Sequence, residues 1–190
     1  MAPENAISQV VRGFALITSI AFAFAASATE NNVYTNPDLV AEIEYGLICN
    51  TRITGTTDAP DTDSGSVNVL TGTINFTSHG TVVPAILGLS FGVKSRTSED
   101  SINEVTIRVT HPPLIGTGTT EQSWQGYMQS SQLLAQLYKF EDPSELAIGT
   151  WVISAYKNET LLYSIPFTVV SPADAPAYLK NLCKGENMSS

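Results

Sequence analysis

The sequence predicts an all-β protein, an antiparallel β-sandwich of the immunoglobulin-like type with a short C-terminal helix. Short segments in which apolar and polar residues alternate recur along most of the chain, and this pattern is typical of strands with one buried face. Turn-forming residues separate the segments at near-regular intervals, as they do in sandwiches. The predicted sandwich spans residues 42–171.

Residues 1–28 have the layout of a secretory signal peptide. Arg12 precedes a short apolar run at 13–26, and Ala26-Ser27-Ala28 offers small side chains at the positions that signal peptidase reads. The run is shorter than the roughly 20 residues that a membrane span needs. We therefore expect cleavage after Ala28, an exported protein that is periplasmic or secreted, and no membrane span after signal removal. No cysteine follows the small residues, so we expect no lipid anchor.

The charge balance argues against one class of partner. The chain has 18 acidic and 9 basic residues, for a formal net charge of −9. An acidic surface repels nucleic acid and anionic headgroups, so we expect no nucleic-acid binding. The length of the exported part is that of one domain.

The two cysteines, Cys49 and Cys183, are expected to form a disulfide. An isolated pair usually bonds in an oxidising compartment. The alternative is two separately buried thiols. These cysteines alone do not predict a metal site, because no Cys-x-x-Cys spacing or nearby histidine completes one, and we expect no cofactor.

The first half of the predicted fold begins with a loose, polar N-terminal arm at 29–41 and continues with strands at 42–49 and 67–78. The clearest alternation comes next. Its apolar side chains share one face and are expected to point into the core: Leu87, Leu89, Phe91 and Val93.

The second half continues with a strand in which Val105, Ile107 and Val109 face inward. Residues 123–139 are compatible with a helix or a strand, and we favour a strand. A helical turn capped by Asp142 and Glu145 leads into a hairpin of two strands, 151–156 and 161–170. Residues 172–190 are expected to form a short helix and a tail, with Asp174 as cap and Leu179 and Leu182 facing inward.

A set of short motifs occurs in a characteristic order along the folded part: Tyr45-Gly46, Val83-Pro84-Ala85, Leu87-Gly88, Phe91-Gly92, Pro112-Pro113, the segment 138–143, Glu145-Leu146, Gly149-Thr150-Trp151 and Phe167-Thr168-Val169. Together they resemble the bacterial family of domain of unknown function 3859, over roughly residues 43–170. The resemblance implies an exported immunoglobulin-like fold and brings no established activity. Ser144 departs from the family pattern, which has an aromatic residue there, and the tail that carries Cys183 lies outside the shared region.

One motif is typical of hydrolases. Gly88-Leu-Ser90-Phe-Gly92 matches the nucleophile-elbow pattern, with Asp100 and His111 downstream. That elbow needs a strand, a sharp turn and then a helix. Because the pattern lies inside a continuous alternating strand, we expect Ser90 not to be a nucleophile and predict no catalytic residue.

Other polar and aromatic groups also have two interpretations. Asp58, Asp61 and Asp63 are weak calcium candidates, and a solvated acidic turn is the favoured alternative because no closing acidic residue follows. Tyr138 and Phe140 are candidates for an exposed recognition patch, whereas Trp151 is expected in the core.

Three function classes remain. We favour a non-catalytic module, not an enzyme, that binds an envelope protein or a glycan, because each catalytic pattern lacks its structural context. The first alternative is a pilus-type or other surface assembly subunit. The second is a hydrolase of unrecognised type.

Overall fold

The computed structural model describes residues 32–49, 51–100 and 102–183. The predicted signal peptide, residues 1–28, lies outside the described residues. Regular structure in the described part is almost entirely strand, with one 3₁₀ turn at Pro143–Glu145. None of its helical segments has the length and apolar character required to cross a membrane.

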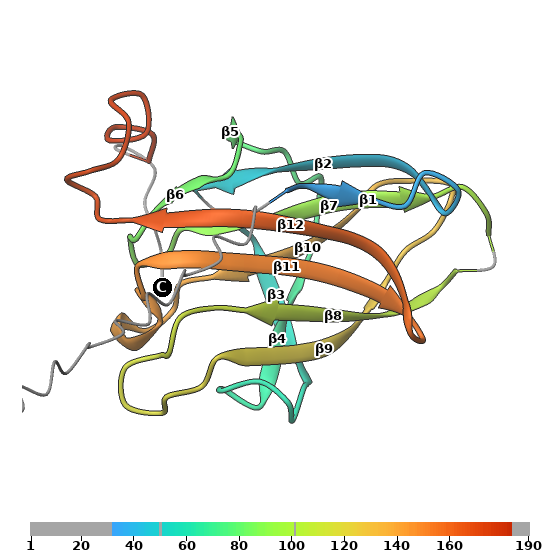
Figure 1. The fold of residues 1–190 in the computed structure, drawn as a ribbon, viewed down its shortest axis with the longest axis horizontal. Helices are drawn as coiled ribbons and strands as arrows, with labels where there is room; N and C mark the ends of the chain where they lie inside the picture. The colour runs from blue at the N-terminus through green and yellow to red at the C-terminus, as the bar shows by residue number, and fades with distance from the viewer. Residues whose placement is uncertain (1–31, 50, 101, 184–190) are drawn as a thin grey trace, which may run out of the picture. The chain divides into compact units, whose positions relative to one another are not determined.

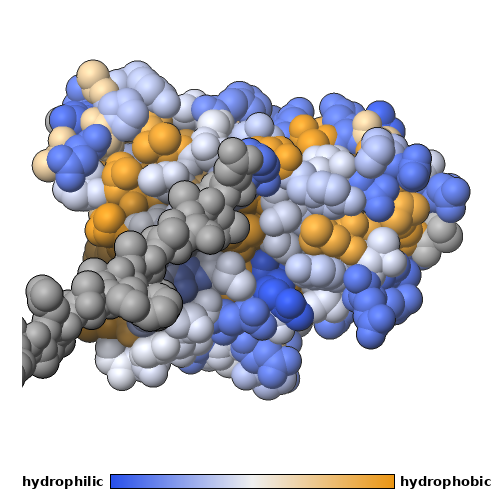
Figure 2. All heavy atoms as spheres, viewed as in Figure 1, coloured by the Kyte–Doolittle hydropathy of each residue, from blue (hydrophilic) through white to orange (hydrophobic). Residues whose placement is uncertain are grey.

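The larger of two main sheets has six strands (Figure 1). Five antiparallel strands follow one another in the order β1 (Tyr34–Thr35), β12 (Thr160–Val170), β11 (Gly149–Lys157), β8 (Glu104–Thr110) and β9 (Glu121–Tyr127). The sixth, β6 (Val82–Pro84), pairs with β12 in parallel. Figure 2 views this sheet from outside and shows hydrophobic and hydrophilic residues intermixed on the visible surface.

The second main sheet has four strands in the order β10 (Leu134–Lys139), β7 (Ser90–Thr97), β2 (Val40–Ile48) and β5 (Ser78–His79). Two further strands, β3 (Ile53–Asp58) and β4 (Ser66–Leu70), form a hairpin sheet of their own. The segment 123–139, favoured as strand, contributes to β9 and β10, which lie in different main sheets. The predicted all-β class and this strand assignment are confirmed.

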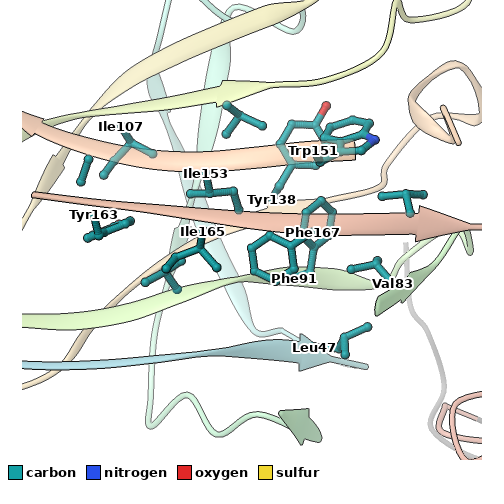
Figure 3. Close-up of a cluster of buried hydrophobic side chains, with 14 of the residues drawn as sticks. Leu47, Val83, Phe91, Ile107, Tyr138, Trp151, Ile153, Tyr163, Ile165 and Phe167 are labelled. Carbon is teal, nitrogen blue, oxygen red and sulfur yellow. The ribbon is translucent and has the colours of Figure 1, made fainter. Parts of the chain in front are cut away.

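The core lies between the two main sheets. Phe91 of the smaller sheet is fully buried, and its ring lies 5.1 Å from that of Phe167 and 5.8 Å from that of Trp151 in the larger sheet (Figure 3). Leu89 and Val93 are buried beside it as predicted, and so is Trp151. Alternation along each strand therefore produces the two apolar faces that the sandwich buries.

Leu87 is the exception on this face, because 41% of it is exposed. The prediction that it points into the core is wrong. Strand β7 begins only at Ser90, and the chain turns at Gly88, whose φ of 83° favours glycine. The alternation in the sequence thus begins before the strand does.

The β11–β12 hairpin and its preceding turn follow the prediction. The backbone N–H of Ser144 donates to Asp142 Oδ1 at 2.8 Å, and that of Asp142 donates to Glu145 Oε2 at 2.9 Å, which completes the capping box. The side-chain and backbone hydrogen bonds from Ser144 lower the pKa of Asp142. Asn158, with φ 53°, turns the chain between the two strands.

Two predictions for the N-terminal half need correction. The predicted arm is not loose throughout, because Tyr34–Thr35 pairs with β12 and Val40 already belongs to β2. The predicted strand at 67–78 ends as β4 at Leu70. Gly72, with φ 86°, breaks the extended chain soon afterwards, and only Ser78–His79 pairs again.

The predicted C-terminal helix is not seen. Residues 172–183 form turns, such as the one closed by Leu179 N–H donating to the Pro176 carbonyl at 2.9 Å. Pro172 and Pro176 lack N–H donors, and so short an isolated helix is marginal. The segment is nevertheless anchored, because Leu179 is buried.

The predicted disulfide is confirmed. Cys49 and Cys183 are bonded with their Cα atoms 5.3 Å apart, across 134 positions of sequence. It attaches the C-terminal turns to the end of β2, which Cys49 follows.

Candidate functional site

The β3–β4 hairpin runs across the direction of the sandwich strands (Figure 1). Its tip is attached to the start of β9. Ser123 N–H donates to the Asp61 carbonyl at 3.0 Å, and Asp63 N–H donates to Gln122 Oε1 at 2.9 Å. Farther along the hairpin, Asn68 Nδ2 donates to Glu141 Oε1 at 3.0 Å. The hairpin is therefore held at two places.

A groove in two parts follows the hairpin. The first part has a volume of about 1220 Å³ and is lined by Ile48, segments 51–53, 70–75 and 139–141, and by Thr77, Leu87 and Gly88. The second has a volume of about 710 Å³ and lies between β4 on one side and β9 and β10 on the other. The two parts share lining residues, among them Leu70, Ile74, Lys139 and Glu141. We call the whole the hairpin groove.

Apolar side chains are exposed along the hairpin groove. Val69 and Leu87 are each 41% exposed, and Tyr127 is 58% exposed. Trp124 also lines it and donates its indole N–H to Gln136 Oε1 at 3.3 Å. Exposed apolar side chains gathered in a concavity indicate a binding site more strongly than the same side chains scattered singly.

Basic side chains also line the hairpin groove, although the whole chain has a net charge of −9. They are Arg52, Lys94 and Lys139. Lys94 Nζ lies 3.0 Å from Glu44, and Lys139 Nζ lies 3.7 Å from Glu141. Arg52 is exposed and has no ion pair within the part of the chain that the structure describes. Glu141 and Glu145 also line the groove, so its three basic side chains lie near two carboxylates, and the charge of Arg52 is the one left without an ion pair among the described residues.

A buried polar network lies beneath the wall of the groove. His111, Gln122 and Tyr138 are 6%, 4% and 7% exposed. Gln122 Nε2 lies 3.2 Å from His111 Nε2 and 3.0 Å from the Tyr138 hydroxyl, and that hydroxyl donates to Glu145 Oε1 at 2.9 Å. Gln122 Oε1 is occupied by the Asp63 N–H, so both ends of the amide are bonded.

These contacts determine the proton positions in the network. His111 Nδ1 lies 2.9 Å from the Pro112 carbonyl oxygen, which can only accept, so Nδ1 carries the proton and Nε2 accepts from Gln122. The ring stacks on Trp151 at 4.5 Å. Burial lowers the pKa of His111, against the opposing effects of the Pro112 bond, Asp63 and Glu145. Burial, with the charge of Glu145, raises the pKa of Tyr138.

The structure corrects the predicted recognition patch. Tyr138 is 7% exposed and Phe140 is fully buried, so the prediction that these rings are exposed is wrong. They alternate with Leu137 and Lys139 along the strand, and the sequence does not reveal which alternate set faces the core. Tyr138 instead belongs to the polar network.

The aspartates considered for calcium are all exposed. Asp63 accepts a hydrogen bond from Thr119 Oγ1 at 2.8 Å, and the Asp61 carbonyl accepts from Ser123, so both contribute to attaching the hairpin. Across the described residues, no three His, Cys, Asp or Glu side chains lie close enough together to form a metal site. Asp58, Asp61 and Asp63 therefore do not form one either.

Ser90 does not have the geometry of a nucleophile elbow. It is the first residue of β7, is 1% exposed, and pairs with Ile48 on one side and Lys139 on the other. The strand continues to Thr97, where an elbow would require a turn and a helix. Asp100 accepts from the Ser130 hydroxyl, while His111 belongs to the network.

The hairpin groove is the feature that sequence reasoning missed. Its walls come from segments far apart in the chain, and Asp63 and Gln122, which join them, are 59 positions apart. A partial signal existed in the loop 71–77, rich in threonine and following an apolar strand, but nothing local locates it beside β10.

These features define an all-β sandwich with a hairpin that forms one wall of a groove. The chain belongs to the family described as domain of unknown function DUF3859, whose model matches residues 37–169. This confirms the resemblance. Among solved structures, the chain is similar to an immunoglobulin-like protein from Pseudomonas aeruginosa, with 20% sequence identity and a TM-score of 0.46, over 75% of this chain and 99% of the other. The search of curated proteins found no match.

Proposed function

We propose that this protein is an exported, non-catalytic binding module that holds a partner of the cell envelope in the hairpin groove. The observation that carries the proposal is the combination of exposed apolar side chains and basic side chains along one concave surface of an acidic chain. Binding sites combine apolar lining with a few polar groups that orient the ligand in this way.

Export is supported by the signal-like composition of residues 1–28 and by the bonded pair Cys49–Cys183. Disulfides form and persist in oxidising compartments. The partner therefore belongs to the periplasm or the cell exterior.

The polar network favours binding over catalysis. Both ring nitrogens of His111, both ends of the Gln122 amide and the Tyr138 hydroxyl are occupied by partners within the protein. A general base must instead reach a proton of its substrate. The network stabilises the wall of the groove by satisfying buried polar groups.

Photocrosslinking in cells of the source organism tests the proposal. A photoreactive amino acid replaces Val69 or Leu87 in the groove and, as control, Tyr178, which is 63% exposed and does not line the groove. We expect light-dependent adducts of the same envelope component from both groove positions, none from position 178, and their loss in Lys139→Glu. Equal labelling from position 178, or no adduct from either groove position, would contradict the proposal.

A further inference from the structure

Strand β10 has an open edge in the hairpin groove. It pairs with β7 on one side, and no described strand pairs with its other side. Phe140 N–H, just after β10, donates at 3.0 Å to the carbonyl of Leu89, the residue that precedes β7. In an antiparallel ladder alternate residues bond to the same neighbour. The N–H and C=O groups of Gln136 and Tyr138 therefore point to β7.

The same alternation determines what the open edge offers. The N–H and C=O groups of Ala135, Leu137 and Lys139 point away from β7, toward the groove. Two residues of a strand rise about 6.6 Å, so these groups form a regular row of donors and acceptors. An extended peptide has groups at the same spacing.

We propose that the hairpin groove binds an extended peptide segment of the partner as an added strand on the open edge of β10. This inference rests on the proposed function and names the class of partner that the groove holds. Main-chain hydrogen bonds to Ala135, Leu137 and Lys139 supply affinity, and side chains in the groove supply specificity, as in other cases of strand addition.

The two walls of the groove define the peptide's alternate positions. A strand that extends the smaller sheet past β10 directs one set of side chains toward β9, whose Trp124 faces Gln136 of β10, and the other set toward Val67 and Val69 of β4. All three are apolar or aromatic. The peptide therefore carries apolar side chains at alternate positions.

Charge selects one further feature of the peptide. Lys139 lies at the end of β10 and lines both parts of the groove, and Arg52 lines the adjoining part. A carboxylate near these two side chains is attracted to them, whereas the net negative charge of the rest of the chain repels anions. Lys139 is already paired with Glu141, whereas Arg52 has no ion pair within the described residues, so the peptide is acidic at the end that extends past Lys139 toward Arg52.

Peptide selection followed by amide exchange tests the inference. A phage-displayed library of random twelve-residue peptides is panned against the full chain, expressed for export and purified as the cell processes it. Selected peptides are synthesised, and hydrogen exchange is measured by NMR with and without them. We expect acidic, alternately apolar peptides that slow exchange at Ala135, Leu137 and Lys139 at least tenfold, while Gln136 and Tyr138, already bonded to β7, change little.

Variants at one position separate backbone pairing from side-chain contact. Leu137→Pro removes an N–H that points outward, whereas Leu137→Ala keeps it. We expect the peptide Kd to rise about a hundredfold or more in Leu137→Pro and less than tenfold in Leu137→Ala, with both variants folded by near-UV circular dichroism. Should Leu137→Pro not fold, the exchange experiment on the unaltered protein decides alone.

The outcomes distinguish this inference from the proposed function. If a peptide or an oligosaccharide blocks crosslinking at Val69 and leaves the exchange of Ala135, Leu137 and Lys139 unchanged, groove binding stands and strand addition is wrong. If no library peptide blocks crosslinking while the envelope adduct persists, strand addition is again overturned. Only the absence of an envelope adduct from both groove positions of the otherwise unaltered protein would contradict the proposed function and strand addition together.

Discussion

The two sides of this sandwich treat their edge strands in opposite ways. On one side, β12 is covered along most of its outer edge: β1 pairs with Tyr163 and Ser164, and β6 pairs with 168–170. Pro166, which has no N–H, lies between the two pairings. On the other side, β10 has no strand on its outer edge within the described residues, and the hairpin groove follows it.

This difference bears on function because an exposed edge is a liability. Unpaired edges template aggregation, so natural sheets shorten them, cover them or interrupt them with proline. The N-terminal segment helps to cover β12: Asn36 N–H donates to the Leu162 carbonyl at 2.8 Å. A fold that protects one edge so fully and leaves another open beside an apolar groove is expected to use the open one.

The largest effect is expected from removing the disulfide, which lies at the end of β2 in the half of the smaller sheet away from β10. The Cys49→Ser/Cys183→Ser double variant should lose up to about 5 kcal/mol of unfolding free energy, because the chain-entropy model gives that value for so long a loop. Urea unfolding measures the loss. The same variant should keep the crosslink from Val69, which lines the part of the groove beside β10. The part that Leu87 lines also includes Ile48 and Thr51, which lie close to Cys49 in the sequence, and is therefore not part of this test. Loss of the Val69 crosslink would show that the two sides are not independent.

The second effect concerns the polar network on the open side. Tyr138→Phe removes the hydroxyl that accepts from Gln122 and donates to Glu145. We expect a loss of about 1–3 kcal/mol, the usual cost of leaving a buried donor unsatisfied. Tyr127→Phe is the control, because Tyr127 is 58% exposed. Equal losses in the two variants would argue against the network as a stabilising element.

The elements that local periodicity describes were predictable from the sequence. Val105, Ile107 and Val109 are all buried, as their alternation predicts, and the turn capped by Asp142 and Glu145 depends on residues three positions apart. A strand with one apolar face carries its own orientation, because a shift of one residue would expose the whole set.

The groove and its lining were not predictable, because they depend on contacts between distant segments and not on local periodicity. In β10, the consecutive residues Leu137 and Tyr138 point to opposite faces and both have large, mainly apolar side chains. The alternation therefore does not show which face of the strand is buried. The open edge depends on which strand lies next to β10, and the hairpin position depends on the contact between Asp63 and Gln122. The helix predicted at the C-terminus had a local cap signal in Asp174, but the disulfide and the prolines hold that segment in turns.

A third, smaller effect is a pH dependence of stability. Because burial lowers the pKa of His111, the unfolded state binds a proton at a pH where the folded state does not. Stability from this group is fully present above the unfolded pKa of about 6.5 and decreases as the pH falls toward the folded value, by at most about 1.4 kcal/mol per pH unit. We expect unfolding free energies between pH 7 and pH 5 to fall more steeply in the wild type than in His111→Gln. Parallel curves would contradict this assignment.

The smallest effect on stability, and the sharpest test of the open side, comes from Asn68→Ala. The bond from Asn68 to Glu141 is exposed, so its loss should cost less than about 1 kcal/mol in global unfolding. It nevertheless holds β4 across the groove, and amides of β4 should exchange faster when it is absent, because local opening then requires fewer broken contacts. Glu141→Gln is the matched control: it keeps an acceptor for Asn68 and loses the ion pair with Lys139. Faster exchange in both variants would show that the negative charge of Glu141 is needed to hold β4 in place. Faster exchange in Asn68→Ala alone would show that the hydrogen bond between Asn68 and residue 141 holds β4 as the groove wall.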